Sequence, residues 1–411
     1  MTANSAVEFL IWLLIAASII ALVARRLRIP YTAALVAGGV LLSLLHLPYL
    51  SPLAPGQRPD WLTPNVILIL FLPALVFEGS IKLDLREVTR DSVPLLLLAN
   101  IGVLLAAAVT GYAVHWVTGL PILSTLLFGS IISATDPISV LAIFRDLRIN
   151  RRLSMLIEGE SVLNDGTAAA LFQILMGGLL AGHLTVATGT GPFVLAVAGG
   201  AGLGSVLGYV ASRITEKIDD PEVEITITTI VAYGSYLLAH HLHLSGIIAT
   251  AAAGLIVGNL GARKGMSART RAALESFWEY VAFVMNSLIF LLIGLEVHID
   301  ALARSWRPLL FSVIAVLVGR AAAVYLLVPA SNLVADNIPV RWRHILVWGG
   351  LRGGLALALA LSLDSSFPDR QLLLDLTFGV VIFSILIQGL TLKPLLRILD
   401  LVEDRPDKEP T

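Results

Sequence analysis

Apolar runs long enough to cross a lipid bilayer recur from one end of this chain to the other. A helix needs about 20 such residues to span a hydrocarbon core of roughly 30 Å. Only 14% of the 411 residues are charged, whereas a water-soluble domain of this size shows far more charge at its surface. The pattern predicts an all-α polytopic membrane protein.

Breaks at proline, glycine and charged residues divide the apolar sequence into thirteen predicted spans. The fifth and the twelfth are themselves interrupted, at Thr135-Asp136-Pro137 and at residues 349–354. Interrupted spans at related places in two halves of a chain are typical of inverted-repeat transporters. The predicted spans are 6–24, 30–47, 63–81, 92–118, 121–144, 152–181, 190–213, 223–241, 245–260, 272–297, 303–331, 341–363 and 371–398.

Basic residues alternate between the loops in a way that indicates an orientation. Most of the 28 Lys and Arg residues fall in the odd-numbered loops and at the C-terminal end, which the positive-inside rule assigns to the cytoplasm. The first span reads as retained rather than cleaved, because its positive charges follow it. We therefore expect one transmembrane domain over residues 1–398, with its N-terminus outside, and a short cytoplasmic tail over residues 399–411. The outer loops carry four basic residues, Arg58, Arg304, Arg307 and Arg370.

Composition removes several functional classes. The chain has no cysteine, which excludes disulfide frameworks and thiolate metal sites. A net charge of -1 and the lack of a long basic stretch predict no nucleic-acid partner. His240, His241 and His243 fall at the outer end of the eighth span without further ligands for a metal ion. We expect no cofactor.

We identify six ionisable residues deep inside predicted spans, where each costs about 2.5 to 3.5 kcal/mol on insertion scales. Residues retained at that cost usually face the bundle interior and mark an ion or proton pathway. The six are Glu78, Asp136, Glu160, Asp165, Arg320 and Arg352.

The strongest polar cluster lies at residues 160–165. On a helix, Ser161 and Asp165 share one face, and Glu160 and Asn164 share the neighbouring face. The structural alternative is a polar seam that joins neighbouring helices. Asn164 stands beside Asp165 and cannot exchange a proton. If the cluster exchanges protons for a cation such as sodium, this favours one proton per sodium ion.

Asp136 lies at the interruption of the fifth span. Pro137 removes an amide donor and pushes the preceding residue out of the helical region. The backbone carbonyls freed at Thr135 and its neighbours could coordinate a cation, since irregular backbone at membrane depth is tolerated where it lines protein or water. The alternative is a simple kink in which Asp136 caps the half-helix that follows.

The remaining charged residues suggest pairs. Glu78 precedes Lys82 by four residues, the favourable order for a pair on a helix surface. Arg352 stays protonated and needs a carboxylate partner inside a bundle, for which we predict Glu160. For Arg320 two alternatives stay open, a second carboxylate or a position close enough to a span end to reach water.

A buried carboxylate is unstable when bare and charged, so it holds a proton unless a cation replaces that proton. Sodium and proton would then compete for the same group, and this competition couples their movements. Carboxylate, hydroxyl and carbonyl oxygens suit an alkali cation better than a transition metal.

Three motifs resemble the NhaP/NHE branch of the cation/proton antiporters, in their order and on their spans. Residues 70–78 also resemble the third-span motif of that family. The three motifs are Ala134-Thr135-Asp136-Pro137, Glu160-Ser161-x-x-Asn164-Asp165 and Gly350-Leu351-Arg352-Gly353.

The resemblance implies a thirteen-helix homodimer in the cell membrane, with a dimerisation half, a core half and two unwound spans that cross near the ion site. It implies exchange of Na⁺ for H⁺, with Li⁺ or K⁺ as alternatives, and Asn164 as a mark of the electroneutral class. Glu160 would pair with Arg352. The Na⁺ site implied by the motifs comprises Asp165, Asp136, Ser161, Glu78 and the Thr135 carbonyl.

Two other functional classes are alternatives to an antiporter. A channel or a transporter of another solute is one, although a channel usually offers a ring of repeated filter residues. An intramembrane aspartyl protease using Asp136 and Asp165 is the other, but it would leave Ser161, Asn164 and Arg352 without a role. The sequence favours an antiporter over an enzyme.

Overall fold

The computed structural model describes residues 3–27, 29–44, 63–181, 185–297, 299–364, 367 and 369–402. These residues form helices and connecting segments, and no strand occurs among them. Eight of the helices are long and apolar enough to cross a membrane. Arg58 of the predicted outer loops and residues 403–411 of the predicted tail lie outside the described residues.

Thirteen helical segments of the described chain correspond to the predicted spans, and some consist of helices that continue one another. The short helices α4 (Leu85–Arg90) and α14 (Ile299–Arg304) lie between them. The thirteen segments are α1 (Ala3–Leu27), α2 (Tyr31–Leu44), α3 (Pro64–Lys82), α5–η2–α6 (Ser92–Leu96, Leu97–Gly102, Val103–Thr118), α7–α8 (Ile122–Ser133, Ile138–Leu147), α9 (Arg151–Ala181), α10 (Val186–Thr215), α11 (Pro221–His241), α12–η3 (Gly246–Ile256, Val257–Gly265), α13 (Ala268–Leu295), α15 (Trp306–Ser331), α16–α17 (Val340–Trp348, Gly354–Leu361) and α18–η4–α19 (Arg370–Phe383, Ser384–Gln388, Gly389–Ile398).

Polar residues start several of these helices. The side chain of Asp220 accepts a hydrogen bond from the backbone N–H of Val223 at 3.0 Å, and Ser267 accepts one from Thr270 at 3.3 Å. Each bond satisfies a donor that the first helical turn leaves free. The caps explain why α11 and α13 begin where they do.

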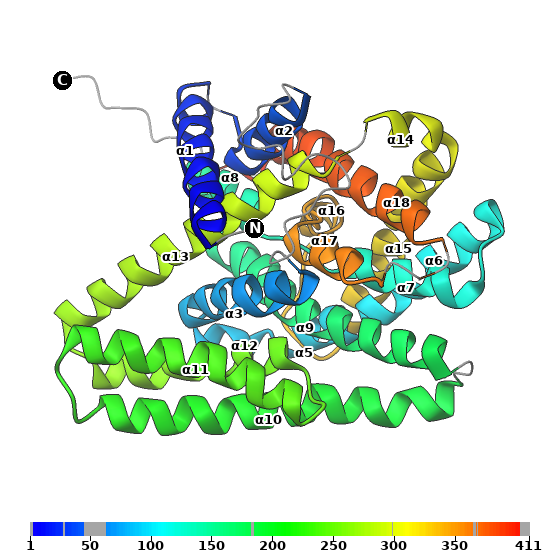
Figure 1. Cartoon of the computed structure of the whole chain (residues 1–411). Coiled ribbons are helices and arrows are strands. Elements are labelled where there is room, and N and C mark those ends of the chain that lie inside the picture. Colours follow the sequence, from blue (N-terminus) through cyan, green and yellow to red (C-terminus); the bar gives the residue numbers. More distant parts are fainter. Residues whose placement is uncertain are drawn as a thin grey trace, which may run out of the picture.

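The helices pack mainly within two groups (Figure 1). The first group contains α1, α2, α3 and α10 to α13, and the second contains α5 to α9 and α15 to α19. Within the first group, Gly204 and Gly208 of α10 lie so close to the backbone of Ala249 and Ala253 on α12 that a Cβ would overlap it. Close approach at small residues is the usual way for helices to associate in a membrane.

The two groups meet along α3, α10, α12 and α13 on one side and α9 and α17 on the other. Figure 1 shows α3 and α9 in the interior of the molecule, with α10 and α11 side by side along its lower edge. Both interrupted spans belong to the second group. Residues of both interruptions lie next to α3 and α13 of the first group, so the interruptions are at the boundary between the groups.

Candidate ion-binding site

The two interrupted spans contact each other at their interruptions. Helix α7 ends at Ser133 and α8 begins at Ile138, while α16 ends at Trp348 and α17 begins at Gly354. The backbone N–H of Asp136 donates to the carbonyl of Leu351 at 2.7 Å. The predicted breaks in the fifth and twelfth spans are confirmed, and one backbone hydrogen bond joins them.

Gly353 makes this contact possible. A Cβ at that position would lie against Cβ, Cγ and Oδ2 of Asp136. A larger residue would therefore push the two breaks apart, because packed interiors offer little spare room. Gly353 of the twelfth-span motif therefore leaves room for the side chain of Asp136 on the fifth span.

Charged side chains stabilise the ends of the half-helices. Asp136 Oδ1 accepts from the backbone N–H of Ile138 at 3.1 Å. Asp136 therefore caps the start of α8, as the alternative prediction for this residue stated. Arg352 donates to the carbonyls of Ser133 and Ala134 at 3.0 and 3.3 Å. A cation at the C-terminal end of α7 compensates the negative end of the helix dipole.

The π-helical turn η4 holds the Arg352 backbone in place. Ser384 is the first residue of η4, and its hydroxyl accepts from the backbone N–H of Arg352 at 2.8 Å. Short π-helical turns often occur at functional sites.

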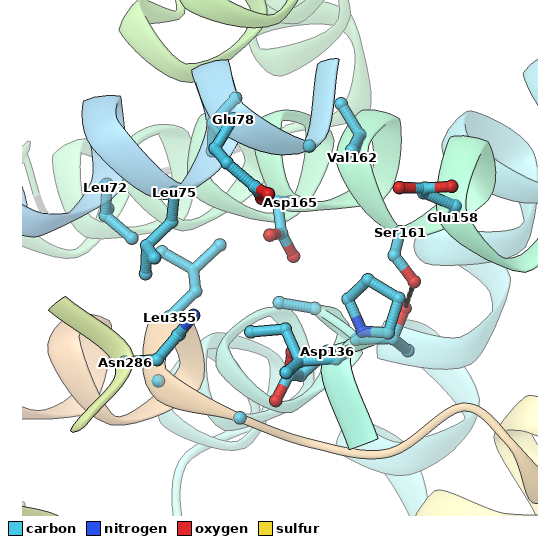
Figure 2. Close-up of a pocket in the computed structure, with 18 of the residues that line it drawn as sticks. Leu72, Leu75, Glu78, Asp136, Glu158, Ser161, Val162, Asp165, Asn286 and Leu355 are labelled. Atoms are coloured by element: carbon cyan, nitrogen blue, oxygen red, sulfur yellow. Dashed lines mark hydrogen bonds between the residues drawn. The ribbon is translucent and has the colours of Figure 1, made fainter. Parts of the chain in front are cut away.

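A cavity of about 100 Å³ lies beside the break in the fifth span. Its walls come from α3 and α13 of the first group and from α8, α9, α17 and the break between α7 and α8 of the second. Figure 2 shows Asp136 and Asp165 on opposite sides of this space. The polar residues that line it are Glu78, Thr135, Asp136, Glu158, Ser161, Asp165 and Asn286.

Asp165 has an oxygen that the described protein does not satisfy. Its Oδ1 is buried and has no hydrogen-bond partner. A buried polar atom without a partner is costly, and a bound proton or cation removes that cost. The cavity is large enough for a small ion, since a water molecule occupies about 30 Å³.

A hydrogen-bond network connects α9 with the unwound backbone. Asn164 Nδ2 donates to Thr135 Oγ1 at 2.6 Å and to Glu160 Oε1 at 3.0 Å, and Asn164 Oδ1 accepts from the Thr135 N–H at 3.2 Å. The hydroxyls of Thr135 and Ser161 lie 2.9 Å apart. The amide of Asn164 is therefore a structural link, and Ser161 and Thr135 are held at the cavity wall.

The predicted partner of Glu160 is wrong. Glu160 pairs with Arg320, not with Arg352, through two hydrogen bonds of 2.6 and 2.7 Å. Arg320 also donates to the carbonyl of Leu346 near the end of α16. This geometry uses the planar guanidinium fully, which explains why Arg320 is buried and does not reach water. In the described part of the chain, Arg352 has no carboxylate at ion-pair distance.

Glu78 lines the cavity but is paired elsewhere. Lys82 Nζ lies 2.5 Å from Glu78 Oε1 and 3.0 Å from Oε1 of Glu279 on α13. Of the two readings of Glu78, a surface pair or an ion ligand, the structure has the pair. No three Asp, Glu or His side chains of the described residues form a group that could hold a metal ion. The structure brings together Asp136, Asp165, Thr135 and Ser161, with Glu78 bound to its lysine.

Sequence reasoning missed two polar residues of the cavity, Glu158 and Asn286. Glu158 lies two residues before Glu160 and within electrostatic range of Glu78, Lys82 and Arg145. Asn286 and Ser287 precede a long apolar run in the predicted tenth span. The cost of a polar residue in a span was the available signal for both.

Comparison with known proteins identifies relatives over nearly the whole chain. Residues 13–398 match the family described as "Sodium/hydrogen exchanger, transmembrane". The chain is 40% identical to the Na⁺/H⁺ antiporter NhaG of Bacillus atrophaeus, over 93% of this chain and 73% of that protein. It is 38% identical to the Na⁺/H⁺ antiporter NhaH of Halobacillus dabanensis, over 96% of this chain and 98% of that protein.

Solved structures give the same fold. The sodium proton antiporter MjNhaP1 from Methanocaldococcus jannaschii superposes with a TM-score of 0.79 at 20% sequence identity, over 98% of this chain and 100% of that chain. The helical architecture described above is therefore the NhaP fold.

Proposed function

This chain belongs to the sodium/hydrogen exchanger family of multi-pass membrane proteins, which exchange Na⁺ for H⁺; we propose that it exchanges one Na⁺ for one H⁺ at the cavity between Asp136 and Asp165. The observation that carries the proposal is the unpartnered Oδ1 of Asp165, buried beside a second carboxylate in a cavity at the boundary of the two helix groups.

The proposed mechanism is competition for one negative charge. A bare carboxylate at membrane depth is strongly disfavoured, so Asp165 is occupied either by a proton or by an alkali cation. The two occupied states carry the same charge. The occupied site can therefore move relative to the opposite wall, whereas the empty site is held back by desolvation.

The buried charges support one-for-one exchange. Glu160 and Arg320 neutralise each other. Arg352 lies within electrostatic range of Asp165, and its positive charge balances one of the two aspartates. Among Asp136, Asp165 and Arg352 one negative charge remains, and one Na⁺ or one H⁺ compensates it.

The remaining site residues have supporting roles in this proposal. Ser161 and the backbone of Thr135 supply neutral oxygens, while Asn164 holds Thr135 against α9. Glu78 is a further ligand only when it leaves Lys82. Cation ligands of this type suit Na⁺ and Li⁺, with K⁺ as a larger alternative.

Alternating access would follow from movement of the two helix groups against each other, because the cavity has walls from both. We further propose a homodimer in the cell membrane, surrounded by lipid, with the N-terminus outside and the positively charged loops in the cytoplasm. The exposed apolar residues of α1 and α10 are available for lipid or for a second copy.

The test is proton movement into sealed proteoliposomes that contain a trapped pH dye. Sodium, lithium or potassium is added to wild type, Asp165→Asn and Asp146→Asn, whose side chain is 68% exposed and far less costly to alter. We expect sodium to collapse a pH gradient in wild type and in Asp146→Asn but not in Asp165→Asn.

A clamped membrane voltage tests the stoichiometry. A rate that does not change with voltage supports one-for-one exchange, whereas a voltage-dependent rate contradicts it. Full activity of Asp165→Asn would show that the ion site lies elsewhere.

A further inference from the structure

We infer that Asn286 is a cation ligand that the first helix group contributes to the site, and that its carboxamide oxygen helps to set the choice among Na⁺, Li⁺ and K⁺. The inference rests on the proposed function, because it assigns a further ligand to the same cavity.

Asn286 is placed to reach the cavity from the wall opposite Asp165. It lies on α13, is only 7% exposed and lines the space beside Asp136 and Asp165. Figure 2 shows its side chain extending from α13 toward Leu355 and the centre of the cavity. The two aspartates belong to the second helix group, so Asn286 faces them across the boundary between the groups.

The amide of Asn286 has no hydrogen-bond partner within the described residues. The contrast with its neighbour is direct, since Ser287 contacts the hydroxyl of Tyr31 and donates to the carbonyl of Phe283 at 2.5 Å. The amide atoms of Asn286 are also not among the fully buried polar atoms, so they reach the space of the cavity. An amide inside a helix bundle that the protein leaves without a partner is costly. A leucine of nearly the same shape would avoid that cost, so packing alone gives no reason for an asparagine here.

The chemistry of a carboxamide fits a transported alkali cation. Its carbonyl oxygen is a hard, neutral ligand of the kind that alkali and alkaline-earth ions accept. Because it is neutral, it adds affinity without changing the charge balance of Asp136, Asp165 and Arg352. One-for-one exchange is preserved, whereas an aspartate at this position would add a charge.

The position of Asn286 also makes cation affinity depend on the arrangement of the two groups. Glu78 is the other polar cavity residue from the first group, and Lys82 already occupies it. Asn286 is thus the available ligand from that side. Selectivity among alkali ions depends on ligand number and cavity size, and a ligand from the opposite wall affects both.

The experiment measures the apparent KM for Na⁺, Li⁺ and K⁺ in proteoliposomes containing wild type, Asn286→Leu, Asn286→Gln and Asn286→Asp. Tyr280→Phe is the control, because it removes a polar group from the same helix at a side chain that is 67% exposed. Exchange at saturating cation gives the maximal rate separately.

For Asn286→Leu we expect the KM for Na⁺ to rise about tenfold, the change that corresponds to about 1.4 kcal/mol, with a maximal rate within about twofold of wild type. The ratio of Na⁺ to K⁺ affinity should also change. Asn286→Gln keeps the oxygen and should restore part of the Na⁺ affinity. Asn286→Asp should bind cations at least as tightly as wild type and make exchange voltage-dependent. Tyr280→Phe should behave as wild type.

Unchanged KM values and an unchanged selectivity order in Asn286→Leu would overturn the inference. If Asn286→Leu does not assemble, the comparison of Asn286→Gln with wild type decides, together with the stabilisation that added NaCl gives each purified protein against heating. Asp165→Asn distinguishes a failure of the inference about Asn286 from a failure of the proposed exchange site. If Asp165→Asn is inactive while Asn286→Leu is normal, only the role of Asn286 fails. If Asp165→Asn exchanges ions normally, the proposed site itself fails.

Discussion

The two interrupted spans have the same layout but different chemistry. In each one, an arginine donates to carbonyls where the first half-helix ends: Arg352 at Ser133 and Ala134, and Arg320 at Leu346. The break in the fifth span then presents the carboxylate of Asp136 to the cavity. The break in the twelfth span presents glycine and backbone.

The arginines differ in how their charge is balanced. Arg320 forms a bidentate pair with Glu160 and is locally neutral. Arg352 donates to backbone carbonyls only, and within the described residues its Nε has no partner. We conclude that the Arg320 end is a fixed structural joint, whereas the charge of Arg352 remains available to the ion site.

The largest expected effect comes from breaking the structural joint. Arg320→Met leaves Glu160 buried without a partner, which should destabilise the protein by about 3 to 5 kcal/mol. We expect little assembled protein in the membrane, measured by yield and by the thermal midpoint in detergent. The double variant Arg320→Met with Glu160→Leu removes both charges and should recover much of the stability. If the double variant is as unstable as Arg320→Met, then the contact between Arg320 and Glu160 does not act mainly through charge pairing.

A smaller effect on stability is expected at the other arginine. Arg352→Gln loses the charged hydrogen bonds to the carbonyls of Ser133 and Ala134, but it breaks no ion pair and so leaves no buried carboxylate that has lost its direct partner. The protein should still assemble, while Na⁺-driven proton movement falls by about tenfold or more, as measured in proteoliposomes. If Arg352→Gln assembles as poorly as Arg320→Met, the distinction between the two arginines is wrong.

The smallest effect tests the contact between the two breaks. Gly353→Ala places a Cβ against Asp136, and overpacking of this kind costs about 1 to 3 kcal/mol. We expect a lower exchange rate with only a modest fall in thermal stability. Gly202→Ala is the matched control, because a Cβ there meets nothing within 4 Å. Equal exchange rates in the two variants would show that the breaks need no close contact.

Sequence reasoning predicted much of the fold. Hydropathy located thirteen segments, and each corresponds to a helical segment of the described structure, because a bilayer imposes length and apolarity on every span. Pro137 and the glycines at residues 349–354 predicted both interruptions, since these residues break helices locally. The motifs led to the correct family.

The site was predicted less completely. Asp136, Asp165, Ser161 and Thr135 do line one cavity, as their shared helix face and the unwound backbone suggested. Asn286 was missed because it lies on α13, far in sequence from the motifs at residues 134–165 and at residues 350–353. Only the packing of α13 brings it to the cavity that the motifs line. That the five residues predicted for the Na⁺ site coordinate the ion stays a prediction.

The partner of Glu160 shows where the limit lies. By itself the sequence determined that the chain crosses the membrane many times, that two spans break, and which charged side chains must be buried. Spacing along one helix sets which residues share a face, and solvation sets which of them need a partner. Which arginine supplies that partner depends on how α9, α15 and α17 pack, and distances between helices are decided only when the whole bundle has formed.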